Sequence, residues 1–223
     1  MKENLKPDFY RHLSLAAVGG FFGAYAMLCH SDMLASAQTM NLLELLMATL
    51  RGEPRAILLH VGALLIYVSG VMLTVLLPHW LGISAKRAVP VIDAVAAIVL
   101  GLLPDSVFGF VALYPIFFAM SFQWSAFSGA RGYSSSSIFS TNNTKQASLA
   151  VAEFISDGDR KHLGKAFFFV MTLLAFHAGA AVSFFSVRAF GIKGAWCNLL
   201  LIGASFAAIL YEERAVSLVP EAE

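Results

Sequence analysis

Long apolar runs separated by shorter polar stretches dominate the chain. Six runs stand out, at approximately Leu13–Cys29, Ala56–Leu77, Ala88–Leu103, Val107–Phe127, Leu163–Val187 and Gly194–Tyr211. A helix of about 20 mostly apolar residues can cross a lipid bilayer, and prolines or glycines close several of the runs. The pattern predicts an all-α polytopic membrane protein with about six transmembrane helices. No stretch resembles a soluble segment, so we expect a single transmembrane domain over residues 1–223.

Two polar interruptions do not fit a simple series of spans. From Leu13 to Leu50 the chain carries almost no charge, and one helix of that length would be about 57 Å long at about 1.5 Å per residue. A bilayer core is only about 30 Å thick, so this segment must break, and its polar residues lie in CHSDMLASAQTMN. The second interruption is RGYSSSSIFSTNNTKQ, which covers Arg131–Gln146 after the fourth apolar run. Either it is a loop exposed to water, or it lines something polar inside the membrane.

The two interruptions resemble each other after a shift of 102 residues. Each copy reads Asn-x-x-Glu/Gln before a helical stretch, a capping-box arrangement with asparagine in the cap position. The halves at about residues 6–103 and 105–214 then hold three spans each, so the second half must enter the membrane from the opposite face. This predicts a 3+3 inverted-topology repeat, a construction common among secondary transporters. The shift pairs Thr39 with Thr141, Asn41 with Asn143 and Glu44 with Gln146.

The helical stretches after the interruptions are too short to span a membrane. They either lie along its surface as amphipathic connectors, or they start near the midplane and run outward to Gly52 and Gly158. Non-helical backbone at that depth requires a protein-lined or watery cavity, and two helix N-termini that face it favour an anion. The second interpretation predicts a transporter or channel for a small solute of anionic character; the alternative is a non-transport assembly or sensor protein. The candidate substrate-binding residues are Gln38, Thr39, Asn41, Gln123, Arg131, Ser140, Thr141, Asn142 and Asn143.

Three titratable residues are candidates for coupling to an ion. His30 and Asp32 lie together in the first interruption, where a histidine could bind a proton, but a solvated loop pair explains them equally well. Asp93 lies inside the third apolar run, where a carboxylate is costly and is a functional candidate by default. The alternative is that Asp93 lies near the interface, close to Lys86 and Arg87.

Lysine and arginine are distributed unevenly between the predicted loops. With the N-terminus placed inside, eleven of the fifteen basic residues fall on the cytoplasmic side and four on the other side. Because basic residues concentrate in cytoplasmic loops, we expect a multi-pass protein with both termini in the cytoplasm. The same rule offers an alternative for Arg131, as an ordinary basic anchor at that face.

Composition supports lipid as the solvent and excludes several other classes. Hydrophobic residues make up 58% of the chain, charged residues only 13%, and the mean hydropathy is +0.73, which leaves too little charge for the surface of a soluble domain. The net charge of +1 and the lack of a basic cluster give no sign of nucleic-acid binding. Cys29 and Cys197 have no metal-ligand or disulfide spacing, and common hydrolase and nucleotide-binding motifs are missing. We therefore expect no enzyme activity, metal or cofactor; the expected partners are the bilayer, a small molecule or ion and, in a homo-oligomer, a second copy of the chain.

Three motifs give the chain a resemblance to a known family. SAQTMN after the first run, FAMSFQWSAF in the fourth and GYSSSSIFSTNN after it resemble the YoaK-like family of bacterial inner-membrane proteins of unknown function. The resemblance covers nearly the whole chain and implies about six transmembrane helices and a bacterial inner-membrane location, but no substrate. The family's first motif usually reads Gln-Thr-Gly-Asn, whereas Met40 stands here in place of the glycine, and Asn142 precedes Asn143 where glycine is also expected. If those glycines allow a close approach, this member differs in its substrate or has lost the site.

Overall fold

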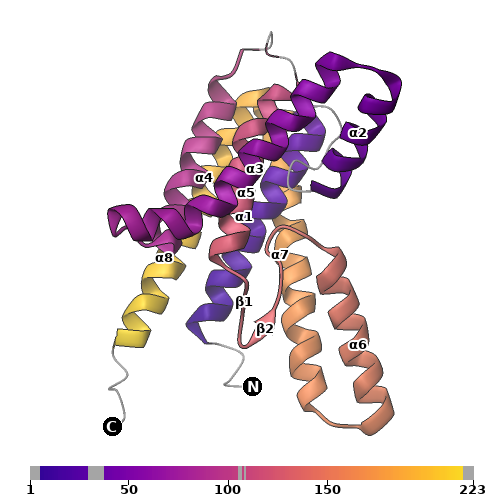
Figure 1. The fold of residues 1–223 in the computed structure, drawn as a ribbon. Coiled ribbons are helices and arrows are strands. Elements are labelled where there is room, and N and C mark those ends of the chain that lie inside the picture. The colour runs from indigo at the N-terminus through magenta and orange to yellow at the C-terminus, as the bar shows by residue number, and fades with distance from the viewer. Residues whose placement is uncertain (1–5, 30–37, 105–106, 108, 218–223) are drawn as a thin grey trace.

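A computed structural model describes residues 6–29, 38–104, 107 and 109–217 of the chain (Figure 1). Over these residues the protein is almost entirely helical, which confirms the all-α prediction. One helix overlaps each of the six predicted apolar runs, and a further helix begins within each polar interruption. The helices are α1 (Pro7–Cys29), α2 (Gln38–Arg51), α3 (Pro54–Leu81), α4 (Ala85–Leu102), α5 (Tyr114–Ala126), α6 (Thr141–Asp157), α7 (Lys161–Phe190) and α8 (Asn198–Ser217), with short 3-10 helices η2 (Val111–Leu113) and η3 (Gly191–Cys197).

Three stretches of the described chain are long and apolar enough to cross a membrane. They are Pro7–Cys29, Pro54–Leu81 and the continuous stretch Lys161–Ser217, which contains both α7 and α8. Large apolar side chains lie exposed on the outer faces of these helices, for example Leu65 and Val75 on α3. Such a surface is unfavourable in water and suits lipid, so the structure has the character of a membrane protein.

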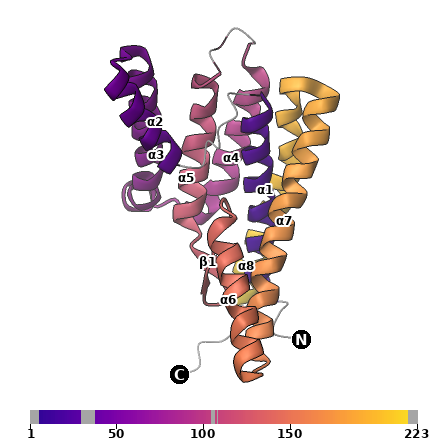
Figure 2. The ribbon, with the colours of Figure 1, turned by 90° about the vertical axis from the view of Figure 1, so that its right-hand side faces the viewer.

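The long helices form an interleaved bundle. α1 packs against α7 and α8, and α5 packs against α3 and α4. The short helix α2 packs against α3, and the short helix α6 packs against α7. The contacts of the first four helices therefore match those of the last four. If α1 corresponds to α5, α2 to α6, α3 to α7 and α4 to α8, each of these contacts in one half has a counterpart in the other. α1, α4 and α7 run away from the end of the bundle that holds both termini, whereas α3, α5 and α8 run toward it (Figures 1 and 2).

The two short helices lie alongside the bundle, at opposite ends of it. α6 lies beside the part of α7 near the termini, and α2 lies beside α3 toward the other end (Figure 2). Each helix stops at a glycine in the left-handed conformation, with φ of 68° at Gly52 and 73° at Gly158. Both helices run next to long helices rather than across the ends of the bundle.

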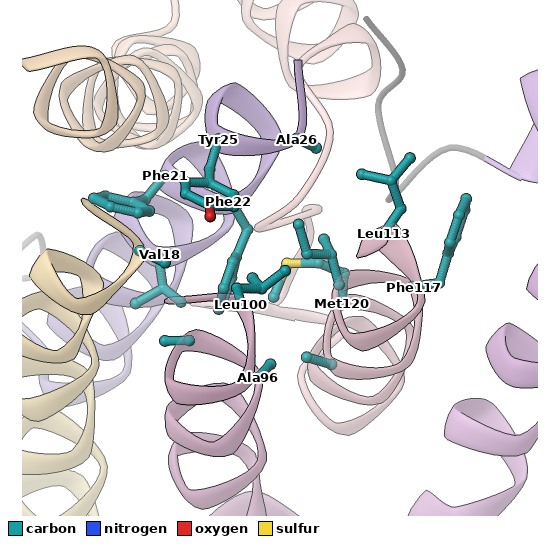
Figure 3. Close-up of a cluster of buried hydrophobic side chains, with 14 of the residues drawn as sticks. Val18, Phe21, Phe22, Tyr25, Ala26, Ala96, Leu100, Leu113, Phe117 and Met120 are labelled. Atoms are coloured by element: carbon teal, nitrogen blue, oxygen red, sulfur yellow. The ribbon is translucent and has the colours of Figure 1, made fainter. Parts of the chain in front are cut away.

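The interior is filled by aromatic and aliphatic side chains from most of the helices. Val18 and Phe22 of α1 meet Leu100 of α4 and Met120 of α5 in one buried cluster (Figure 3). Burial of such side chains stabilises soluble proteins through water exclusion, whereas in lipid the close packing itself supplies most of the stabilisation.

α1 and α7 cross at a reciprocal pair of glycines. A Cβ atom added to Gly20 would lie 1.8 Å from the carbonyl oxygen of Phe176, and one added to Gly179 would lie 1.9 Å from that of Ala17. Real Cβ atoms do not approach backbone oxygens so closely, so only glycine fits at both places. Small residues allow this kind of backbone contact between membrane helices.

The turn between α6 and α7 carries the polar groups expected of a segment in water. The backbone N–H of Asp159 donates to the Asp157 carboxylate over 2.9 Å, and this bond holds the pKa of that carboxyl below its usual value. Lys161 forms an exposed ion pair with Asp159 at 2.7 Å. This charged turn therefore forms a polar end of the bundle.

Candidate functional site

The starts of α2 and α6 meet at one cavity of about 890 Å³, called here the main cavity. Its polar lining comes from the first turns of the two short helices and from the residue before α6, and its apolar lining comes mainly from the long helices. Tyr67 and Phe176 lie near the middle of α3 and α7, so the cavity is positioned halfway along these helices. The lining residues are Met27, Gln38, Thr39, Tyr67, Trp124, Ile138, Phe139, Ser140, Thr141, Asn142, Lys145 and Phe176.

Asn41 anchors the first turn of α2 to a histidine on α3. Its Nδ2 donates to the carbonyl oxygen of His60 over 3.1 Å and to Gln38 Oε1 over 3.0 Å. Its Oδ1 lies 2.9 Å from His60 Nδ1. Asn41 is the fourth residue of the helix and is fully buried. The prediction of an asparagine cap is therefore wrong here, because the amide bonds to α3 instead of to a first-turn N–H.

Asn143 has the corresponding place in the second half, and it is not a cap either. Ser140 is the N-cap residue of α6, and its side chain makes no capping hydrogen bond. Asn143 Nδ2 donates to the carbonyl oxygens of Ser136 at 2.7 Å and Phe139 at 3.1 Å. Its Oδ1 accepts a hydrogen bond of 2.9 Å from Ser135 Oγ. Buried asparagines thus fix the positions of both short helices from inside their first turns.

Three of the four serines in the run that precedes α6 are buried, whereas Ser134 is exposed. Ser135, Ser136 and Ser137 are 2%, 6% and 0% exposed. Ser137 Oγ accepts a hydrogen bond of 2.8 Å from Gln123 Nε2, which also donates to the carbonyl oxygen of Leu15 at 3.2 Å. Gln123 therefore does not line the main cavity, although the sequence placed it among the binding candidates. It holds the serine segment against α1 and α5.

Arg131 lies away from the main cavity, at the tip of a small hairpin. The hairpin pairs β1 (Gly129–Ala130) with β2 (Tyr133–Ser134), and its two turn residues have positive φ angles, 56° at Arg131 and 76° at Gly132. Two positive angles are typical of a type I′ turn. The backbone N–H of Arg131 donates to Asp8 Oδ2 over 2.6 Å. The structure therefore does not bring Arg131 together with the other predicted binding residues.

A second cavity of about 420 Å³ lies beneath this hairpin and is called here the hairpin cavity. Arg11 lines it, pairs with Glu212 of α8 at 2.6 Å and donates to the carbonyl oxygen of Gly129 at 2.7 Å. These contacts join the first helix, the hairpin and the last helix at the end of the bundle that holds the termini.

Of the coupling candidates, the structure describes only Asp93. Its side chain is fully buried in α4, and neither carboxylate oxygen has a hydrogen-bond partner among the described residues. The neighbouring Arg87 pairs with Glu213 at 2.9 Å, so the structure gives no support to a pairing of Asp93 with Arg87. His30 and Asp32 lie outside the described residues.

The electrostatics of the main cavity favour negative charge. The first-turn N–H groups of a helix have no partner within the helix, and they carry the positive end of its dipole. The ammonium group of Lys145 adds a full positive charge to the lining, and none of the described residues that line the cavity is an aspartate or glutamate. The wall formed by Tyr67, Trp124 and Phe176 is apolar or aromatic. The cavity can therefore accommodate a small anion that also carries an apolar part.

Comparison with known proteins gives a family for the chain. The sequence model of a family described as protein of unknown function (DUF1275) matches residues 12–211. The chain belongs to the DUF1275 family. The match confirms the relation to a family of unknown function that the three sequence motifs indicated. No curated protein and no solved structure matches the chain.

Sequence reasoning missed several residues of this DUF1275 protein. Lys145 lies two residues after Asn143, inside the polar interruption, and its place in the predicted helix could have pointed to the cavity. Tyr67 and Phe176 gave no comparable indication, because aromatic residues recur along five of the six apolar runs.

Proposed function

We propose that this DUF1275 protein carries a small anionic solute across the bacterial inner membrane, with the solute bound in the main cavity. One observation carries the proposal. The first turns of two short helices, 102 residues apart in the sequence, line the same cavity halfway along α3 and α7. Broken helices whose N-termini meet near the membrane midplane are the usual binding arrangement of secondary transporters.

The proposed architecture is a 3+3 inverted repeat with six spans, in which α1, α3 and α4 correspond to α5, α7 and α8. Two observations support this architecture. Corresponding helices have corresponding neighbours, and they run in opposite directions through the bundle. Each of the two corresponding helix pairs also contains a close glycine contact, at positions that the 102-residue shift does not relate. An added Cβ on Gly70 of α3 would meet the Phe118 carbonyl oxygen of α5 at 2.8 Å. Gly179 of α7 meets the Ala17 carbonyl oxygen of α1 in the same way.

The same proposal assigns the orientation and the coupling group. Both termini lie at one end of the bundle (Figure 1), and the basic residues predicted inside outnumber those outside by eleven to four. We therefore place that end in the cytoplasm. Asp93, which is buried without a partner among the described residues, remains the candidate for ion coupling within the spans.

Removal of the cavity's positive charge tests the anion preference. Purified protein is melted with increasing acetate, benzoate, phosphate or sulfate, and with benzyl alcohol as a neutral comparison for benzoate. A bound anion stabilises the folded state in proportion to the logarithm of its concentration over Kd. For Lys145→Gln we expect the apparent Kd of the stabilising anion to rise about tenfold. This corresponds to the loss of one hydrogen bond between charged groups, which contributes roughly 1.4 kcal/mol.

The matched control is Lys193→Gln, which removes the same charge from an exposed position in η3. It should leave the anion response unchanged. An equal loss in both variants would mean that net charge, and not the cavity, governs the response. If no anion stabilises the parent protein, the assembly or sensor alternative is favoured over transport.

A further inference from the structure

A buried histidine is linked to the first turn of α6 by a chain of hydrogen bonds. His12 of α1 is fully buried and stacks on Phe168 of α7, with ring centroids 5.3 Å apart. Its Nε2 lies 2.8 Å from Ser135 Oγ, and Ser135 Oγ donates to Asn143 Oδ1 over 2.9 Å. Asn143 belongs to the turn whose neighbours Thr141 and Asn142 line the main cavity.

The hydrogens of this chain can be assigned by counting donors. An amide nitrogen carries two hydrogens and the amide oxygen carries none. Both amide hydrogens of Asn143 go to backbone carbonyls, so its Oδ1 must receive the single hydroxyl hydrogen of Ser135. Ser135 then has none left for His12, and the hydrogen between them must come from Nε2 of the ring.

This assignment leaves Nδ1 of His12 without a hydrogen. The atom is buried and has no hydrogen-bond partner among the described residues. It can therefore accept one proton without breaking any bond of the chain. The product is an imidazolium ring that still donates from Nε2 to Ser135.

The surroundings determine when such a proton is favourable. An uncompensated charge inside a protein is costly. Arg11 is already paired with Glu212, and Asp8 accepts from the backbone of Arg131 through one oxygen only. The charged and titratable groups near the ring are Asp8 and Arg11 of α1, Glu212 of α8, and Arg131 and Tyr133 of the hairpin.

We propose that His12 is a second proton-binding residue, besides the coupling candidate Asp93, and that its proton accompanies the anion of the transport site. The inference rests on the proposed anion site in the main cavity. An anion at the first turn of α6 compensates the added positive charge, and the proton on Nδ1 in turn favours the anion. Because such coupling is reciprocal, anion and proton bind together and cross the membrane together. Only an N–H bond forms and breaks, and water supplies and takes up the proton.

The tautomer is tested first, by nitrogen NMR of protein labelled with ¹⁵N-histidine, in which the His12 signals are assigned by their loss in His12→Gln. We expect a protonated Nε2 and an unprotonated Nδ1 at neutral pH. In Ser135→Ala the hydrogen is no longer held on Nε2, and a mixture of tautomers is expected. A ring that carries its hydrogen on Nδ1 in the parent protein would overturn the proposal.

The link to the cavity is tested with charged thiol reagents. In protein whose Cys29 and Cys197 are replaced by alanine, Thr141→Cys places a thiol in the main cavity. It is modified with a sulfonate and with a trimethylammonium methanethiosulfonate of equal length. We take the ratio of the sulfonate rate to the trimethylammonium rate. The fraction of thiolate affects both rates equally and cancels, so the ratio reports the local charge. Between about pH 8 and about pH 4, a range that extends below that of an exposed histidine because burial disfavours the charged ring, this ratio should rise about tenfold as the ring gains a proton while the sulfonate occupies the cavity.

Two variants on this background separate the contributions. His12→Gln keeps an N–H donor for Ser135 but cannot gain a charge, so its ratio should stay flat with pH. His60→Gln removes the histidine that contacts the first turn of α2 and should keep the rise. A flat ratio in the parent protein, or a rise that survives in His12→Gln, overturns the proposal and leaves the anion site intact. A thiol that neither reagent modifies contradicts the open cavity itself, and with it both proposals.

Discussion

Gly20→Ala and Gly179→Ala are each expected to prevent α1 and α7 from packing and to abolish most of the folded protein. In each case the new methyl group would lie within 2 Å of a backbone carbonyl oxygen of the other helix. Overpacking a well-packed interior costs about 1–3 kcal/mol when side chains can move aside. A backbone oxygen cannot move without shifting the whole helix, so we expect a loss at or above the top of that range. Size-exclusion chromatography and thermal melting in detergent measure the loss.

Gly164→Ala is the control on the same helix. Nothing lies within 4 Å of a Cβ built at Gly164, and alanine is the better helix former by about 1 kcal/mol. This variant should melt at the same or a higher temperature than the parent. Wild-type stability of Gly20→Ala would show that α1 and α7 do not cross as the structure places them.

Asn143→Ala is expected to destabilise the protein strongly. The substitution leaves two carbonyl oxygens, of Ser136 and Phe139, and the hydroxyl of Ser135 without their partner. Each buried polar group left unsatisfied costs about 1–3 kcal/mol. We therefore expect a loss of at least about 3 kcal/mol, seen as a lower melting temperature and a smaller folded yield.

The neighbouring Asn142→Ala makes the same chemical change at an exposed position that lines the main cavity. It should leave the melting temperature of the unliganded protein unchanged and weaken the stabilisation by anions. Equal melting temperatures for the two variants would contradict the structural role of Asn143. An unchanged anion response in Asn142→Ala would contradict the place of the ligand.

The sequence was sufficient to predict the helices, because apolar runs of this length have few alternatives. The bounds of α3 and α7 differ from the expected ones by two to four residues, and those of α1 and α8 differ by up to six. The two short helices and their terminal glycines were also predictable, since Gly52 and Gly158 follow helical stretches directly. The shift that pairs Asn41 with Asn143 identified two residues that each fix a short helix in place.

The role of these asparagines could not be predicted. A capping asparagine and one that bonds to a neighbouring segment have the same local sequence, and the choice depends on His60 and on the fold of the serine run. The burial of Ser135–Ser137 depends on Gln123 and on α1, which are distant in the sequence. Arg131 was misplaced because two consecutive positive φ angles form a hairpin that carries it away from α6.

The account depends most on the two short helices entering from opposite faces of the membrane. Single cysteines at Glu53→Cys, in the α2–α3 turn, and Asp159→Cys, in the α6–α7 turn, report the side of each turn in a background without Cys29 and Cys197. Intact cells are treated with a maleimide that does not cross membranes, before and after permeabilisation. We predict that the thiol at position 53 is labelled from outside, and that the thiol at position 159 is labelled only after permeabilisation. Labelling of both thiols from the same side would contradict the inverted arrangement and the midplane site built on it.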